Sequence, residues 1–172
     1  MRIPSKKLIV TLCLIAFVGC KSKKDAVVTT KPKEPKVTKV VPEKVDMAQK
    51  DKAYELGRRV LMACNTSKFK PFTPEEATEK VIRNATQERL TKTCHNIQLK
   101  YGNFKGVTFI EAVRDKKNKT NIYRFKANYE KKIANKELRV TMNENNQVTD
   151  LKSLDWMDEY APNGKPKSTV IK

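Results

Sequence analysis

Three side chains in the second half of the chain could carry acid–base chemistry if they shared a cavity. Glu111 is the one acid on an otherwise apolar predicted strand face, and Tyr123 and Tyr129 offer hydroxyls on the next predicted strand. A carboxylate and a phenol can exchange protons with a substrate within hydrogen-bond reach. A single acid without a histidine or aspartate partner does not specify a reaction. We therefore expect no catalytic residue: the tyrosines belong to the core or its rim, and Glu111 meets solvent near a strand end.

Other catalytic and cofactor signatures are missing from the sequence. The single histidine, His95, directly follows Cys94, so on a helix the two side chains point about 100° apart. A zinc site needs about four ligands at suitable spacings, and no further ligand is evident. The sequence also has no nucleophile triad, phosphate loop or calcium loop. We expect neither a metal nor a cofactor.

Cys64 and Cys94 are the two cysteines of the expected folded domain. In an oxidising compartment a lone pair favours a disulfide, which would close a loop of about 31 residues and stabilise the fold by about 3.7 kcal/mol. The alternative is two separate buried thiols that act as small apolar side chains. The sequence leaves both possibilities open.

The first 20 residues have the order of a secretory signal. Two lysines, Lys6 and Lys7, precede the apolar run Leu8 to Val18, and small residues lead to Cys20. The tetrad ending at Cys20, Phe-Val-Gly-Cys, resembles the lipobox of bacterial lipoproteins, in which the cysteine thiol receives a diacylglycerol. An uncleaved membrane anchor is the alternative, but a spanning helix needs about 20 apolar residues.

This resemblance implies a location and one partner, the membrane. Acyl chains on Cys20 would attach the protein stably to the cell membrane or the outer membrane, with its domain facing the periplasm or the cell exterior. Lys21, in place of aspartate after the cysteine, is similar to lipoproteins that travel to an outer membrane. An exported protein is not expected to bind nucleic acid, and the sequence has no zinc-finger spacing or aromatic ribonucleoprotein motif.

Composition divides the chain into four parts. A signal peptide is expected at residues 1–19 and a basic tail at residues 161–172. Residues 20–50 are expected to form the lipidated cysteine and a flexible tether, because residues 21–50 contain nine lysines, four acids, three prolines and no aromatic residue. Residues 51–160 are expected to form one α+β domain.

The first half of this domain has helical periodicity. Apolar residues recur at helical spacing from Asp51 to about Cys64, and Thr73-Pro74-Glu75-Glu76 is typical of a helix start, with a capping threonine and a proline in the first turn. A third helix is predicted from Leu90 to Tyr101, ended by Gly102.

The second half alternates with a period of two, which predicts strands. The strands are expected near residues 107–112, 122–129, 138–142 and 148–154. Helices followed by an antiparallel sheet of about four strands indicate an α+β fold with the helices on one sheet face.

This order of elements is similar to the cone-shaped fold of nuclear transport factor 2-like and cystatin-like domains, including uncharacterised members in bacterial lipoproteins. The resemblance implies a pocket between sheet and helices. Its candidate lining residues are Phe109, Glu111, Tyr123, Phe125, Tyr129, Val140 and Met142.

The expected function is that of a non-catalytic, lipid-anchored envelope protein. Its domain would bind a protein, a glycan or a small apolar ligand. One alternative is an enzyme that uses Glu111 and a tyrosine in the cone pocket. The other is a domain that pairs with itself or with a larger complex through the aromatic face of its sheet.

Overall fold

The computed structural model describes residues 37–40, 44–132 and 135–164. The predicted signal peptide, Cys20, most of the predicted tether and the end of the basic tail lie outside these ranges. In the part of the chain that is described, no helix has the length and apolar character needed to cross a membrane.

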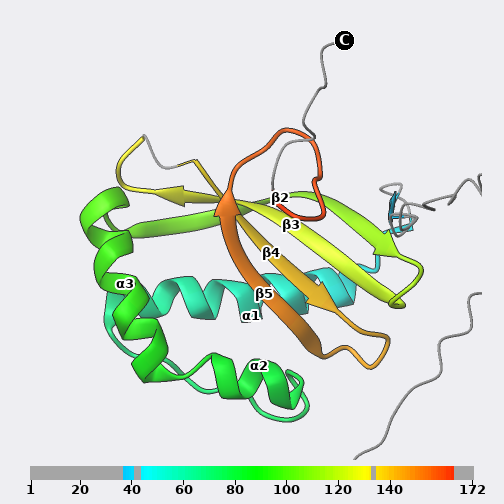
Figure 1. The fold of residues 1–172 in the computed structure, drawn as a ribbon, viewed down its shortest axis with the longest axis horizontal. Helices are drawn as coiled ribbons and strands as arrows, with labels where there is room; N and C mark the ends of the chain where they lie inside the picture. The colour runs from blue at the N-terminus through cyan, green and yellow to red at the C-terminus, as the bar shows by residue number, and fades with distance from the viewer. Residues whose placement is uncertain (1–36, 41–43, 133–134, 165–172) are drawn as a thin grey trace, which may run out of the picture. The chain divides into compact units, whose positions relative to one another are not determined.

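The described residues form an α+β fold of three helices and an antiparallel sheet (Figure 1). The helices are α1 (Met47–Thr66), α2 (Glu79–Asn84) and α3 (Gln87–Tyr101). The strands are β1 (Val37–Lys39), β2 (Phe104–Asp115), β3 (Thr120–Tyr129), β4 (Lys136–Met142) and β5 (Val148–Asp155). The expected α+β class, with helices and an antiparallel sheet, is therefore confirmed.

Local signals explain where α1 and α3 begin and end. The Asp46 side chain accepts a hydrogen bond from the backbone N–H of Gln49 at 2.9 Å and caps α1, so this helix begins before the predicted Asp51. Thr86 caps α3 in the same way, through the N–H of Arg89. Gly102 ends α3 with a φ of 75°, a backbone conformation that glycine adopts without steric cost.

The predicted start of the second helix at Thr73 is wrong, because α2 begins only at Glu79. The Glu76 carboxylate does accept a hydrogen bond from the Thr73 N–H at 3.1 Å, as the motif predicts. However, residues 76–78 also bond to the backbone of Val148: Val148 N–H donates to Glu76 at 2.9 Å, and Thr78 N–H donates to Val148 at 2.9 Å. This pairing with β5 holds the segment extended.

The sheet has five strands in the order β1-β2-β3-β4-β5, so the expected count of about four is corrected. The additional strand, β1, comes from the segment that was expected to be tether. Val37 pairs with Asp115 and Lys39 with Val113 in antiparallel register, and Val40 N–H donates to the Ala112 carbonyl at 2.9 Å. These bonds satisfy an edge of β2 that would otherwise be unpaired.

A β-bulge in β2 changes which face Glu111 occupies. Phe109 lies opposite Phe125, but Glu111 lies opposite Arg124, with a register shift between the two pairs. Residues directly opposite each other share a sheet face, and Phe125 and Arg124 are on different faces. Glu111 therefore does not share a face with Phe109, and the predicted alternation through this strand is wrong at that point.

The helices cover one face of the sheet, here called the inner face (Figure 1). Close approach of α1 to the sheet depends on Gly57, where an added Cβ would lie 2.7 Å from Leu138 Cδ2. A disulfide joins Cys64 of α1 to Cys94 of α3, with their Cα atoms 4.8 Å apart. The opposite face of the sheet is called the outer face below.

Acidification is expected to remove the stabilising contribution of the ion pair between Arg59 and Glu76. Two guanidinium hydrogen bonds, at 2.7 and 2.8 Å, hold the pKa of Glu76 at about 2, below its ordinary 4.5. The folded state thus favours the carboxylate, so the pair stabilises the fold above pH 4.5 and loses that effect as the pH falls toward 2.

Urea unfolding of the wild type and of Glu76→Gln tests this. We expect the stability difference between them to be larger at pH 7 than at pH 2. Glu79→Gln is the matched control, since Glu79 pairs with Arg83 on the exposed surface. A difference that does not change with pH would contradict the role of the pair.

Candidate functional site

The inner-face residues predicted to line a pocket are packed into the core. Tyr123, Phe125, Val140 and Met142 are almost fully buried and belong to one hydrophobic cluster with α1. The expectation that these four residues line an open pocket is therefore wrong. Their side chains fill the space between the sheet and the helices.

Neither predicted tyrosine is placed for proton transfer at neutral pH. The Tyr123 hydroxyl donates a hydrogen bond to Gln49 Oε1 at 2.9 Å, and burial raises the pKa of Tyr123 to about 12. The ring of Tyr129 packs against the rings of Tyr101 and Phe104. Burial raises the pKa of Tyr129 to about 12 as well. Both phenols keep their protons at neutral pH.

Gln49 is a buried polar residue that sequence reasoning missed. Its Oε1 accepts from Tyr123 and from Asn121 Nδ2, and its Nε2 donates to the Asn143 carbonyl and to Asn146 Oδ1 at 2.7 Å. These bonds fix the start of α1 against the turn between β4 and β5. A glutamine in the apolar stripe of a helix is the only sequence signal for this role.

Glu111 lies on the outer face and is ionised within ion pairs. Its carboxylate contacts the Arg124 guanidinium and lies 2.9 Å from Lys39 Nζ. Burial by itself raises the pKa of Glu111, but the hydrogen bonds from Lys39 and Arg124 hold the pKa below its usual value. The expectation that Glu111 meets solvent is wrong, because the residue is buried and lies on the opposite sheet face from Tyr123.

Four charged residues form what we call the buried ion cluster: Glu111, Arg124, Glu137 and Arg139. Arg124 Nη2 lies 2.8 Å from Glu137 Oε2, and Arg139 Nε lies 2.7 Å from Glu137 Oε1. Arg124 is 0% exposed and Glu137 is 1% exposed. Burial by itself lowers the pKa of Arg124, but the bonds to Glu137 and Glu111 raise it above its ordinary value.

The segment after β5 covers this cluster. Arg124 donates to the Met157 carbonyl at 2.7 Å, and its guanidinium lies 5.2 Å from the centre of the Trp156 ring. Arg139 lies 4.7 Å from the centre of the Tyr160 ring. These contacts explain how charged side chains are retained inside the fold, and they assign the cluster a structural role.

An apolar groove opens between β1, the start of α1 and the bulge of β2. It has a volume of about 320 Å³. Its apolar lining residues are Val40, Val45, Met47, Phe109, Ile110 and Ala112. Of the predicted pocket residues, only Phe109 and Glu111 line it, so the site lies beside the predicted position.

Two exposed apolar side chains mark the mouth of the groove. Met47 is 57% exposed and Ile110 is 40% exposed. Ile110 lies within the β-bulge of β2, where the register shifts between Phe109 and Glu111. Phe109 packs edge-on against Phe125 with the ring centres 5.7 Å apart, and Lys50 Nζ lies 5.8 Å from the Phe109 ring centre. The groove thus joins a fixed aromatic floor to an exposed apolar rim with nearby ammonium groups.

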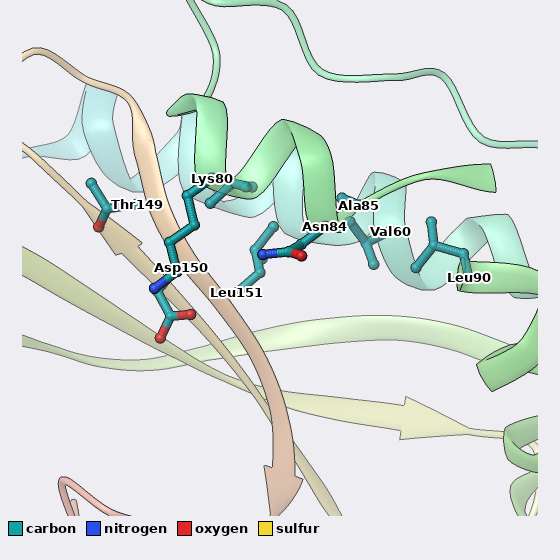
Figure 2. A pocket seen from close by; sticks show the side chains of 9 residues that line it. Val60, Lys80, Asn84, Ala85, Leu90, Thr149, Asp150 and Leu151 are labelled. Carbon is teal, nitrogen blue, oxygen red and sulfur yellow. The ribbon is translucent and has the colours of Figure 1, made fainter. Parts of the chain in front are cut away.

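A smaller cavity lies between α2 and β5 (Figure 2). It has a volume of about 230 Å³. Its apolar lining comes from all three helices, from β5 and from the residue Ala85 between α2 and α3. Asn84 and Asp150 are polar residues of the lining. The apolar lining residues are Val60, Val81, Ala85, Leu90 and Leu151.

Neither similarity to known proteins nor a cluster of metal ligands indicates a further site. No protein-family model, curated protein or solved structure matches the chain. Among residues 37–40, 44–132 and 135–164, no group of three or more histidine, cysteine, aspartate or glutamate side chains is placed to hold a metal ion.

Proposed function

We propose that the protein is a lipid-anchored envelope protein whose folded domain binds a small apolar ligand in the apolar groove. The observation that carries the binding proposal is the exposure of Met47 and Ile110 at the mouth of a 320 Å³ groove. Ligand sites are typically concave, mainly apolar and about 300–1,000 Å³ in volume. The groove falls at the small end of that range.

The anchor proposal is supported by the sequence before the folded domain. Two lysines, an apolar run and the lipobox-like tetrad ending at Cys20 have the order of a lipoprotein signal. We expect that an alkyne fatty acid fed to cells producing the full chain labels the wild type and does not label Cys20→Ser. Cys13→Ser is the control, since Cys13 lies within the apolar run. Equal labelling of the wild type and of Cys20→Ser would contradict the proposed lipid anchor at Cys20.

The charges around the groove favour a ligand without a high net charge. Lys39 pairs with Glu111, and Lys50 Nζ lies 2.9 Å from the Asp51 carboxylate. Both lysines that line the groove therefore have a carboxylate partner. A neutral ligand gains from burial of its apolar surface, at roughly 25 cal/mol per Å², without the need to break these pairs.

Replacing Met47 with aspartate is expected to weaken binding of a neutral apolar probe at least about tenfold. The carboxylate would place a charge on the apolar rim, and removing its water costs more than about 1.4 kcal/mol. A fluorescence titration with N-phenyl-1-naphthylamine measures the change, because this dye brightens in apolar surroundings.

Leu99→Asp is the matched control for this titration. Leu99 is 64% exposed on α3 and does not line the groove. We expect its variant to bind the probe as the wild type does. Equal loss in both variants, or no loss in Met47→Asp, would show that the probe binds elsewhere.

A further inference from the structure

The turn between β2 and β3, residues 116–119, carries three lysines without carboxylate partners. Lys116, Lys117 and Lys119 are all exposed. In the described part of the chain none of them forms an ion pair, whereas Lys92 and Lys136 each pair with a carboxylate. This segment, here called the lysine turn, is therefore a small surface of uncompensated positive charge.

Asp115 fixes the shape of the lysine turn. Its carboxylate accepts hydrogen bonds from the backbone N–H groups of Lys117 at 3.0 Å and Asn118 at 3.1 Å, and from Asn118 Nδ2 at 2.7 Å. Asp115 is only 7% exposed, so this carboxylate faces the turn backbone instead of solvent. Lys119 has a φ of 52°, a conformation that favours glycine, yet the position carries a charged side chain. A defined turn thus presents the three ammonium groups.

The chain enters the sheet beside the lysine turn. Strand β1 runs antiparallel to β2, and its first residue, Val37, pairs with Asp115, the last residue of β2. The residues that precede Val37, including Cys20, are therefore joined to the domain at this end of the sheet. The start of β2, at Phe104, lies at the opposite end (Figure 1). A strand rises about 3.3 Å per residue, so the two ends of β2 are about 35 Å apart.

A lipid on Cys20 would keep the lysine turn within reach of the membrane. Cys20 precedes Val37 by 17 positions. A fully extended chain spans at most about 3.6 Å per residue, so Val37 can lie no more than about 60 Å from the anchored cysteine. The attraction between a lysine and an anionic surface acts within about one Debye length, roughly 10 Å at 0.1 M salt. A basic turn beside the point of attachment can therefore enter that range.

On the basis of the lipid anchor proposed above, we propose that the lysine turn docks on the anionic phospholipid headgroups of the membrane that holds the anchor. Three ammonium groups on one fixed turn are complementary to a surface of phosphate groups. Each lysine near such a surface strengthens the association about fivefold. Docking orients the domain, with the lysine turn at the bilayer and the start of β2 directed away from it.

Acetylation of lysines in the anchored protein tests this orientation. The lipidated protein is placed in phosphatidylcholine vesicles with or without phosphatidylglycerol and treated with N-succinimidyl acetate, an uncharged reagent. Mass spectrometry follows the modification of each lysine. Acetylation of Lys116, Lys117 and Lys119 is expected to be at least about fivefold slower in the anionic vesicles. This difference is expected to disappear at about 1 M salt, where the Debye length is about 3 Å.

Lys105 and Lys132 are the matched controls within the same molecule. Both are exposed, and neither forms an ion pair among the described residues. They lie near the pair Phe104 and Tyr129, at the end of the β2–β3 hairpin opposite the lysine turn. Their acetylation is expected to be equally fast in both kinds of vesicle. Equal slowing at the controls and at the lysine turn, or no slowing at the lysine turn, overturns the proposal.

The mass of the peptide that contains Cys20 separates failure of the docking from failure of the anchor. A lipidated peptide together with a lysine turn that reacts equally in both kinds of vesicle overturns the docking and leaves the anchor in place. A peptide without lipid at Cys20 overturns both.

Discussion

Replacing Arg124 with methionine is expected to lower the free energy of unfolding by about 3–5 kcal/mol. The change removes the cation that contacts both Glu111 and Glu137, and Glu137 is 1% exposed. The two carboxylates then lose the buried cation that they share, and the Met157 carbonyl loses its donor. Urea unfolding at pH 7, followed by circular dichroism, measures the loss.

Two further variants separate the buried cluster from general loss of charge. Lys126→Met removes a cation from the same face of β3 that also lies 5.3 Å from the centre of the Trp156 ring, and it is expected to cost much less. Arg124→Met combined with Glu137→Gln is expected to lower the free energy of unfolding by less than the sum of the two single changes. The double variant removes both members of one ion pair, so neither charge is left buried without the other. Equal losses in Arg124→Met and Lys126→Met would contradict the account of the cluster.

Loss of the disulfide between α1 and α3 is expected to cost about 3.7 kcal/mol of unfolding free energy. Cys64 and Cys94 are separated by 30 positions, and the bond restricts this loop in the unfolded chain. The double variant Cys64→Ala/Cys94→Ala tests the effect by urea unfolding without reducing agent. Both positions are buried, so the alanines also leave small cavities.

Reduced wild-type protein separates the effect of losing the disulfide bond from the effect of losing the cysteine sulfur atoms. It keeps both side chains but not the link, so it is expected to show most of the loss seen in the double variant. Equal free energies of unfolding for the oxidised wild type and the double variant would contradict a stabilising role of the disulfide.

Regular periodicity predicted much of the sheet. The alternation along β3 placed Tyr123, Phe125 and Ala127 on one face, and the register with β4 agrees with it. The end of α3 at Gly102 also follows the sequence, because a helix end that needs a positive φ favours glycine. These features depend on neighbours in the chain, which a sequence displays directly.

The features that could not be predicted depend on distant residues. The bulge beside Glu111 adds one residue to β2, and nothing in the local alternation marks it. The extended segment 76–78 contradicts a good helix start because Val148, some 70 positions later, bonds to it. Strand β1 is only three residues long and forms because β2 offers an edge.

The site was displaced from its predicted place for the same reasons. The resemblance to cone-shaped folds predicted a pocket between sheet and helices, but α1 approaches the sheet closely enough at Gly57 for the inner-face side chains to fill the space. The burial of Arg124 and Arg139 has no signal in the local sequence. Their carboxylate partner Glu137 and the covering segment after β5 come together only in the folded sheet.

The binding of a small apolar ligand in the groove is tested most directly by the methyl signals of the methionines. In protein with ¹³C-labelled methionine methyl groups, Met47 reports on the groove, while Met142 is fully buried in the core and Met157 lies beside Arg124. Addition of N-phenyl-1-naphthylamine is expected to shift the Met47 signal in a saturable way and to leave those of Met142 and Met157 unchanged. A saturable shift at Met142 or Met157 with none at Met47 would contradict the proposed site.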